Sequence, residues 1–170
     1  MLKRVIITLV TFGLLAAPAL AENKIACVDL QKVLRNSKAG AVALQQMQEQ
    51  KNKYEEEFKK RQADLNKLKE ELATQTMMLS DSGKAQKEYE FQVKGRELQR
   101  FQQDAQEDLK WREAMLTKQI LSEAVSVVQK VGKQGGYSVI LEKNEEVLLF
   151  VDPENDLTEQ VIQAYDAGKK

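Results

Sequence analysis

The feature that most limits the fold of this chain is a long central stretch in which helix-breaking residues are nearly absent. The only prolines are Pro18 and Pro153, and residues 41–79 contain neither proline nor glycine. Glu, Gln, Lys, Leu and Ala dominate this segment, and all five favour an α-helix. A helix over residues 41–79 would be about 60 Å long, whereas a compact chain of this size has a radius of gyration of only about 15 Å. The sequence therefore predicts an elongated molecule with a projecting helix.

This segment also carries the alternating four- and three-residue spacing of a coiled-coil seam. The seam positions are Leu44, Met47, Lys51, Tyr54, Phe58, Arg61, Leu65, Leu68, Leu72, Gln75 and Leu79. The face formed by these positions is mostly apolar, so it needs a partner helix.

The partner is predicted to be a second helix over residues 85–131, which contains a single glycine, Gly95. Gly95 either softens this helix or allows another helix to approach closely. Turn-forming residues at 80–84 separate the two helices, which predicts an antiparallel hairpin with its tip there. In that hairpin Phe58, Leu65 and Leu72 would face Phe101, Leu98 and Phe91.

Strand patterns lie at the two ends of the chain. Residues 24–30 form a short apolar run, and residues 137–142 and 147–151 are two further runs separated by a polar turn at 143–146. The last two runs predict a β-hairpin. Cys27 falls within the first run and is expected to be a small apolar residue on a buried strand.

Short helical segments adjoin these strands. A helical turn is predicted over residues 31–35, followed by Ser37 as the N-cap of the long helix. A final helix is predicted over residues 157–167, with Asp156 and Glu159 at capping-box spacing. This corner is acidic, as expected for a solvated helix start, and a calcium site is the alternative. Its acidic residues are Asp152, Glu154, Asp156 and Glu159.

The chain is thus expected to be an α+β protein in which a long hairpin, residues 41–131, is inserted into a small β-rich body made of residues 22–40 and 132–170. So few strand residues cannot bury a core that is stable alone, and their sheet would have open edges. The sequence therefore predicts self-association, in which several copies share one core.

Residues 1–21 have the pattern of a secretory signal peptide. Lys3 and Arg4 precede an uncharged, mostly apolar run at 5–17, and Ala19 and Ala21 supply a small-x-small cleavage pattern. The run is shorter than the roughly 20 residues that span a bilayer, which disfavours a membrane anchor. Cleavage after Ala21 would place the mature protein in the periplasm.

The composition excludes many kinds of chemistry. The chain has no histidine and only one cysteine, so histidine-based catalytic pairs, mixed Cys/His zinc sites and an intrachain disulfide are all ruled out. No catalytic residue, metal site or cofactor is expected. Removing the signal peptide takes away two of the 26 basic residues and none of the 26 acidic ones, so nucleic-acid binding is also not expected.

Motifs along the whole mature chain resemble those of the Skp (OmpH-like) family of periplasmic chaperones. They are the Ile-Ala-x-Val-Asp-Leu-Gln-Lys-Val-Leu stretch at 25–34, Ser37 with Gly40, Phe-Lys-Lys-Arg-Gln at 58–62, Gly-Gly-Tyr-Ser-Val-Ile-Leu at 135–141, and Asp-Pro at 152–153 with Asp-Leu-Thr-x-x-Val-Ile at 156–162. The resemblance implies a homotrimer whose three hairpins extend like tentacles around a cavity. Such proteins hold unfolded outer-membrane β-barrel proteins without nucleotide until these reach the membrane.

In that arrangement the expected trimer core is Ile25, Val28, Val139, Leu141, Leu149 and Val151. Apolar residues away from the seam are the candidates for client binding, because many weak contacts add up to strong binding. They are Met77, Met78, Tyr89, Val93, Trp111 and Met115. The alternative is a purely structural role, in which these residues pack inside the hairpin.

Basic residues near the tip, Lys84, Lys87, Lys94, Arg96 and Arg100, form a candidate patch for weak contact with anionic lipid or lipopolysaccharide. An ordinary solvated helix face is favoured over this patch, because the mature chain is close to neutral. Two other functions compete with the chaperone. A structural or adaptor coiled coil of the envelope would bind one folded partner through the hairpin tip, and an enzyme is disfavoured by the missing histidine.

Overall fold

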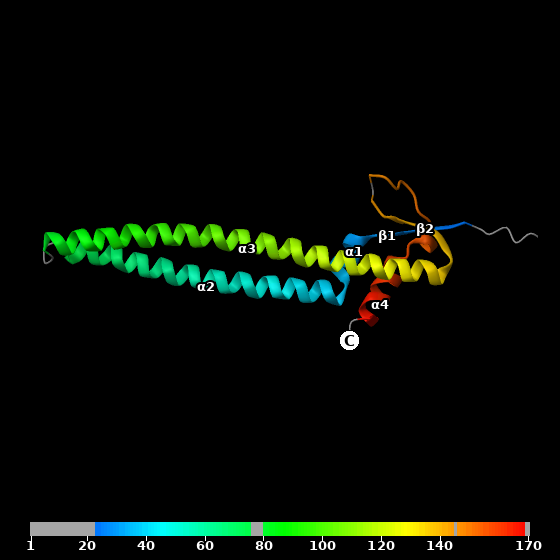
Figure 1. Ribbon diagram of the computed structural model, residues 1–170, viewed down its shortest axis with the longest axis horizontal. Helices are drawn as coiled ribbons and strands as arrows, with labels where there is room; N and C mark the ends of the chain where they lie inside the picture. The colour runs from blue at the N-terminus through cyan, green and yellow to red at the C-terminus, as the bar shows by residue number, and fades with distance from the viewer. Residues whose placement is uncertain (1–22, 76–79, 145, 169–170) are drawn as a thin grey trace, which may run out of the picture.

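The computed structural model describes residues 23–75, 80–144 and 146–168, which form a small body with a long helical hairpin projecting from it (Figure 1). The elements in chain order are β1 (Lys24–Val28), α1 (Leu30–Asn36), α2 (Lys38–Gln75), α3 (Asp81–Gly135), β2 (Tyr137–Glu142), a 3₁₀ turn (Pro153–Asn155) and α4 (Thr158–Gly168). Both ends of the chain build the body, which confirms the expected α+β organisation. The predicted signal peptide lies outside the described residues.

The second hairpin helix is longer at both ends than the sequence predicted, whereas the first begins three residues earlier and is described as far as Gln75. The 38 residues of α2 and the 55 residues of α3 correspond to about 57 Å and about 83 Å. Residues 80–84 open α3 and do not form a separate turn, because the Ser80 hydroxyl caps the helix by accepting from the Gly83 N–H at 3.3 Å. At the other end Gly136, with a φ of 68°, stops α3 in the left-handed conformation that glycine favours.

Most of the predicted seam of α2 faces α3. Leu68 is buried, and the rings of Tyr54 and Phe101 meet edge to face with centroids 5.9 Å apart. Phe58 lines the same groove as Phe101, as the predicted pairing requires. Leu44 was wrongly placed on the seam, since it is 72 % exposed and Ala43 packs against the core instead. Seam position Leu79 lies outside the described residues.

A tight joint at Ser37 connects α2 to the body. The Ser37 N–H donates to the Val33 carbonyl at 3.1 Å and ends α1, while its hydroxyl accepts from the Gly40 N–H at 3.1 Å and starts α2. The predicted N-cap is therefore confirmed. The adjacent Lys38 N–H donates to the Asp166 carboxylate at 2.8 Å, which ties the joint to α4.

The body contains a two-stranded parallel sheet, and this corrects the predicted β-hairpin. β1 pairs with β2, with Ile25 beside Val139 and Cys27 beside Leu141. The opposite edge of β1 is taken by the C-terminal segment, where the Leu157 N–H donates to the Cys27 carbonyl at 2.9 Å. Cys27 is buried as expected, and burial raises the pKa of its thiol.

Residues 147–151 were predicted as the second strand of that hairpin, and they form an irregular loop instead. Asn144 shapes the preceding turn, because its carbonyl accepts from the N–H groups of Val147 and Leu148. β2 already pairs with β1, and the free edge of β1 is used by the C-terminal segment. The apolar composition that suggested a strand is therefore left on an exposed loop that points away from the body (Figure 1).

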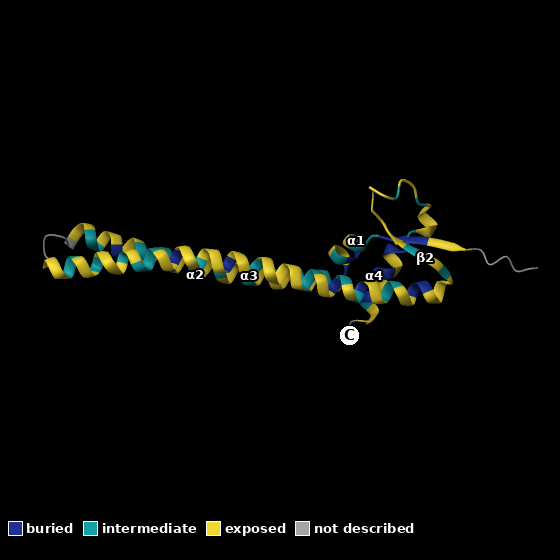
Figure 2. Cartoon of the chain, turned by 45° about the horizontal axis from the view of Figure 1, so that its top comes forward, coloured by how far each residue is buried: buried dark blue, intermediate teal, exposed yellow. Residues whose placement is uncertain are grey.

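The core lies where α1, α4, β1 and the inner end of α3 meet (Figure 2). Its buried members are Ala26, Val28, Val33, Ile120, Ala124, Val131, Leu157, Val161, Ile162 and Tyr165. The Tyr165 hydroxyl donates to Glu123 at 2.5 Å, and burial together with this bond raises the pKa of Tyr165. In contrast, the hairpin shows only isolated buried positions along its length.

The start of α4 differs from the predicted capping box. The Asp156 carboxylate accepts from the Thr158 N–H at 3.0 Å, so the helix begins one residue later than the sequence predicted. Glu159 does not complete the box: it pairs with Lys32 at 2.7 Å, and the Asp156 N–H donates to the Pro153 carbonyl. None of the helices in the described residues is long and apolar enough to cross a membrane.

Candidate functional site

Large apolar side chains are exposed mainly around the body and the inner third of the hairpin. In the body they lie on the sheet and the loop after it, and in the hairpin on the first turns of α2 and the inner half of α3. They are Ile25, Val42, Leu44, Trp111, Met115, Val125, Val139, Leu141, Val147, Leu149 and Phe150. Among the described residues, Tyr89 is the only exposed large apolar side chain nearer the tip. The molecule thus offers its apolar surface close to the body.

Four of the predicted client-binding residues share one face of α3. With about 100° per residue, Tyr89, Val93, Trp111 and Met115 fall within about 80° of the helix circumference. Trp111 is 62 % exposed and Met115 is 49 % exposed, whereas Val93 is half-buried. The exposed part of this face is therefore formed by Trp111 and Met115, with Tyr89 also exposed nearer the tip. Met77 and Met78 lie outside the described residues.

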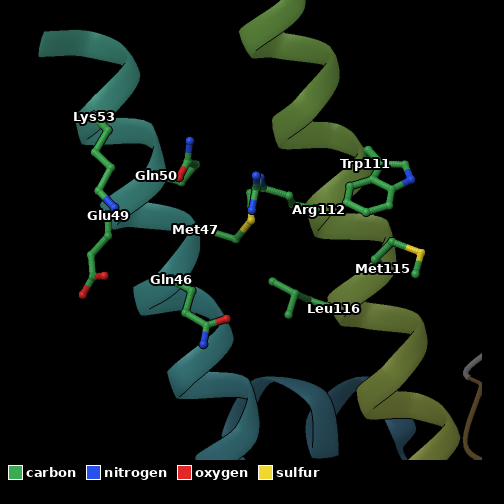
Figure 3. Close-up of a pocket in the computed structure, with 9 residues that line it drawn as sticks. All are labelled: Gln46, Met47, Glu49, Gln50, Lys53, Trp111, Arg112, Met115 and Leu116. Carbon is green, nitrogen blue, oxygen red and sulfur yellow. The ribbon is translucent and has the colours of Figure 1, made fainter. Parts of the chain in front are cut away.

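A groove of about 350 Å³ lies beside Trp111 and Met115, where α2 and α3 run past each other. Met47 and Leu116 reach toward one another from the two helices, while Trp111 and Met115 stand on the far side of α3 (Figure 3). The remaining lining is polar and comes from Gln46, Glu49, Gln50, Lys53 and Arg112. A mixed lining of this kind suits flexible peptide segments, since it offers both apolar contacts and hydrogen bonds.

A second groove of about 420 Å³ continues the first toward the body. The two grooves share Gln46 and Leu116, and the second extends to Val42 and Ile120. The α2 residues at this level include Ala39 and Ala43, which are too small to fill the space between the helices. The grooves exist because this part of the seam has small and polar residues where the outer part has aromatic ones.

A polar and aromatic cluster closes the outer end of the first groove. The Tyr54 hydroxyl donates to the Asp108 carboxylate at 2.7 Å, and the Arg112 guanidinium donates to the same oxygen at 2.5 Å. These bonds raise the pKa of Tyr54 and lower the pKa of Asp108. Arg61 lies 4.5 Å above the centre of the Phe101 ring. The cluster fixes the register of α2 against α3, and we call it the Tyr54–Asp108 clamp.

The predicted basic patch does not form one surface. Lys87 is paired with Glu71 across the hairpin, and Arg100 lies 3.7 Å from Asp104. By helical periodicity Lys84, Lys87 and Lys94 point to a different side of α3 from Arg96 and Arg100. Lys87 and Lys94 line a groove together with Asp64, Glu71 and Glu90, so acidic groups offset their charge.

The predicted trimer-core residues differ in how far one chain buries them. Ile25, Val139 and Leu141 are exposed on the sheet, and Leu149 is 94 % exposed on the loop that follows, while Val151 is half-buried. Val28 is already buried within one chain, so its burial needs no second copy. The sequence pattern also missed two exposed residues of the loop, Val147 and Phe150. Their large apolar side chains were the feature of the sequence that could have marked them as part of the same surface.

The acidic corner is a structural junction. Burial alone would raise the pKa of Asp156, but hydrogen bonds from Lys143 and from the hydroxyl and N–H of Thr158 lower it to about 2. The Thr158 hydroxyl also accepts from the Asp29 N–H at 2.9 Å. No cluster of three potential metal-binding side chains occurs in the parts of the chain that the structure describes. The calcium alternative therefore gains no support here.

Comparison with known proteins identifies the family. The model of the family described as outer membrane protein (OmpH-like) matches residues 24–165, which include the sheet, the whole hairpin and most of α4. The chain belongs to the OmpH-like family. An uncharacterized protein of Aquifex aeolicus is 29 % identical over 141 residues, which cover 83 % of this chain and 85 % of that protein.

The fold of this family member has a solved counterpart. A crystal structure of a candidate outer membrane chaperone (OmpH-like) from Caulobacter crescentus superimposes with a TM-score of 0.80. The match covers 89 % of this chain and 88 % of the other at 20 % sequence identity. At this identity the likeness establishes the arrangement of body and hairpin.

Proposed function

We propose that this protein is an ATP-independent holdase chaperone of the periplasm, which binds unfolded outer-membrane β-barrel proteins and prevents their aggregation. The observation that carries the proposal is the exposure of Trp111 and Met115 beside two grooves of mixed apolar and polar lining. Large apolar side chains that are exposed next to one another mark a binding surface. Membership of the OmpH-like family supports the same role.

The client surface works through many weak contacts. Trp111 supplies a large rigid area and Met115 a flexible, polarisable one, so neither requires a particular client sequence. Glutamine amides beside them can bond to the backbone of an unfolded chain, which every client has in common. A surface of this kind binds unfolded proteins broadly and releases them without nucleotide hydrolysis, because each contact is weak.

The working form is proposed to be a homotrimer, with the three hairpins surrounding a cavity. Support comes from the apolar sheet and loop, where Val139, Leu141 and Leu149 are 45 %, 42 % and 94 % exposed within one chain. An exposed strand edge beside apolar side chains favours association. Three copies would give each client three apolar surfaces, which raises the effective concentration of binding sites.

The test is suppression of aggregation. An outer-membrane β-barrel protein is diluted from urea without ATP, and light scattering is followed while residues 22–170 are added. We expect suppression to be complete near one trimer per client. The double variant Trp111→Ala/Met115→Ala should need several times more protein, with unchanged circular dichroism because both side chains are exposed. Lys110→Ala, beside Trp111 on another side of the helix, is the matched control.

Two results would contradict the proposal. One is a folded oligomer that fails to suppress aggregation at several-fold excess, which would favour the adaptor function and a search for a folded partner. The other is an equal loss of suppression in the double variant and in Lys110→Ala. That result would show that Trp111 and Met115 do not form the client-binding surface.

A further inference from the structure

The outer hairpin, which we define as residues 55–75 of α2 and 81–107 of α3, is weakly packed compared with the body. Of its side chains that the structure describes, only Leu68, Leu98 and Ala105 are buried. The inner end of α3 packs into the body with Ile120, Ala124 and Val131. The helical part of the outer hairpin therefore depends on few core contacts over a long distance from the body.

Other features of the outer hairpin lower its stability further. Gly95 interrupts a helix without a packing reason, since a Cβ added there would meet no atom within 4 Å. The Glu71–Lys87 pair joins the two helices near the tip, but it is partly exposed, and such pairs contribute little. Most of the stability of a helix in a protein comes from the packing of its apolar face, and that packing is sparse here.

The Tyr54–Asp108 clamp bounds the outer hairpin on the side of the body. At the clamp the two helices are joined by a hydrogen bond at 2.7 Å and by the contact of Tyr54 with Phe101. Farther toward the body, α3 enters the core at Ile120. Free energies of local opening follow packing in this way, so weakly packed units open without unfolding of the whole protein.

The outer hairpin holds apolar side chains that would become accessible on opening. Phe58, Leu65, Phe91 and Val93 are all half-buried along the seam. We propose that the outer hairpin unzips locally beyond the Tyr54–Asp108 clamp, and that its separated seam is a second, concealed binding surface for unfolded client segments. This proposal rests on the proposed holdase function and adds a site to it.

Concealment explains why exposed large apolar residues are scarce in the outer hairpin of a protein that binds apolar clients. An open seam in the absence of client would promote association of hairpins with one another. A seam that is closed but needs little free energy to open avoids this association. A client then shifts the equilibrium toward the open form because it binds that form selectively. Larger clients could then engage more of the seam than smaller ones.

Hydrogen exchange on the full oligomer tests the opening. Backbone amides of residues 58–74 and 85–101 are expected to exchange at least about 100-fold faster than those of residues 120–131, under conditions where the body stays folded. Equal protection in both regions would overturn the proposal, because the hairpin would then open only with global unfolding.

A reversible cross-link tests the use of the seam. Glu71→Cys/Lys87→Cys can be joined across the hairpin by a bis-methanethiosulfonate reagent and released by reductant, while Cys27 is buried and its thiol pKa is raised, so it does not compete. We expect the cross-linked protein to suppress aggregation several-fold less well, with recovery on reduction. Lys67→Cys/Glu71→Cys, joined within α2, is the matched control and should leave suppression unchanged.

The two proposals fail in different ways. If the cross-linked and reduced proteins suppress aggregation equally, the concealed site is refuted and the holdase function stands. If the unmodified protein does not suppress aggregation at all, the holdase function is refuted and the concealed client site fails with it.

Discussion

The joint between α1 and α2 allows a sharp prediction about two glycines. A Cβ added at Gly40 would lie 1.8 Å from the carbonyl oxygen of Leu34, and 3.4 Å from the Ser37 hydroxyl. Because the clash is with backbone, no side-chain rotation can relieve it. Gly40→Ala must move α1 away from α2 by more than about 1 Å, which is overpacking of a tight contact. Gly95 is the matched control, since an added Cβ there meets nothing within 4 Å.

The two substitutions are expected to change the free energy of unfolding in opposite directions. Moving the joint disrupts the Ser37 cap, worth about 1 kcal/mol, and adds an overpacking cost of about 1–3 kcal/mol. The higher helix propensity of alanine returns up to about 1 kcal/mol. Gly40→Ala should therefore lose about 1–3 kcal/mol of unfolding free energy. Gly95→Ala has the propensity gain alone and should gain about 1 kcal/mol.

Urea unfolding followed by circular dichroism measures both effects. Wild type and variants are compared at one protomer concentration, because association also contributes to apparent stability. If Gly40→Ala is as stable as Gly95→Ala, helix propensity alone decides both sites, and the close approach at Leu34 described here is wrong. A loss at Gly40 with no gain at Gly95 would instead show that helix propensity does not limit stability at Gly95.

Three further changes test other parts of the structure. Because hydrogen bonds lower the pKa of Asp156 to about 2, its charged form adds about 2 kcal/mol of stability that is present above about pH 4 and is lost as pH falls toward 2. Asp156→Asn should lack this contribution at pH 7, and its urea midpoint should converge with wild type near pH 2. Leu149→Asp should leave the protomer folded, since the side chain is almost fully exposed, but should shift sedimentation from trimer to monomer; intact trimers would remove this residue from the interface. Tyr54→Phe removes the hydrogen bond to Asp108 and should cost about 1 kcal/mol, with faster hydrogen exchange in the outer hairpin and no change in α4.

Most of the fold could be predicted because its signals are local. The absence of proline and the spacing of Tyr54, Phe58 and Leu68 indicate a long paired helix without any knowledge of the body. The Ser37 cap could be predicted for the same reason, since it depends on a neighbour three residues away. Helix ends were less well predicted, because Gly40 looks like a boundary in the sequence but lies inside α2.

The strand pairing could not be predicted from local signals. Residues 147–151 have the composition of a strand, but the choice of partner depends on β1, which lies more than a hundred residues away in the chain. The C-terminal segment at Leu157 competes for the same strand, and nothing in the apolar pattern ranks these alternatives. Likewise, the exposure of Leu44 depends on how α2 crosses the body, which its helical periodicity does not determine.

The candidate site was predicted in part. Trp111 and Met115 stand out in the sequence because they are large apolar residues away from the seam, and the structure places them beside a groove. The groove itself arises because small and polar residues such as Ala43 and Gln46 do not fill the space between the helices. The sequence does not predict such a space unless the register of one helix against the other is already known.

The parallel pairing of β1 and β2 also has a consequence for how proteins of this design can change in size. The two strands lie side by side, so the hairpin leaves the body and returns to it at neighbouring points. Removing seven residues from each long helix would keep the seam in phase and shorten the hairpin by about 10 Å. Insertions of the same length would extend it equally. The reach of the hairpin can therefore vary between related proteins in steps of one heptad, while the body and its contacts stay the same.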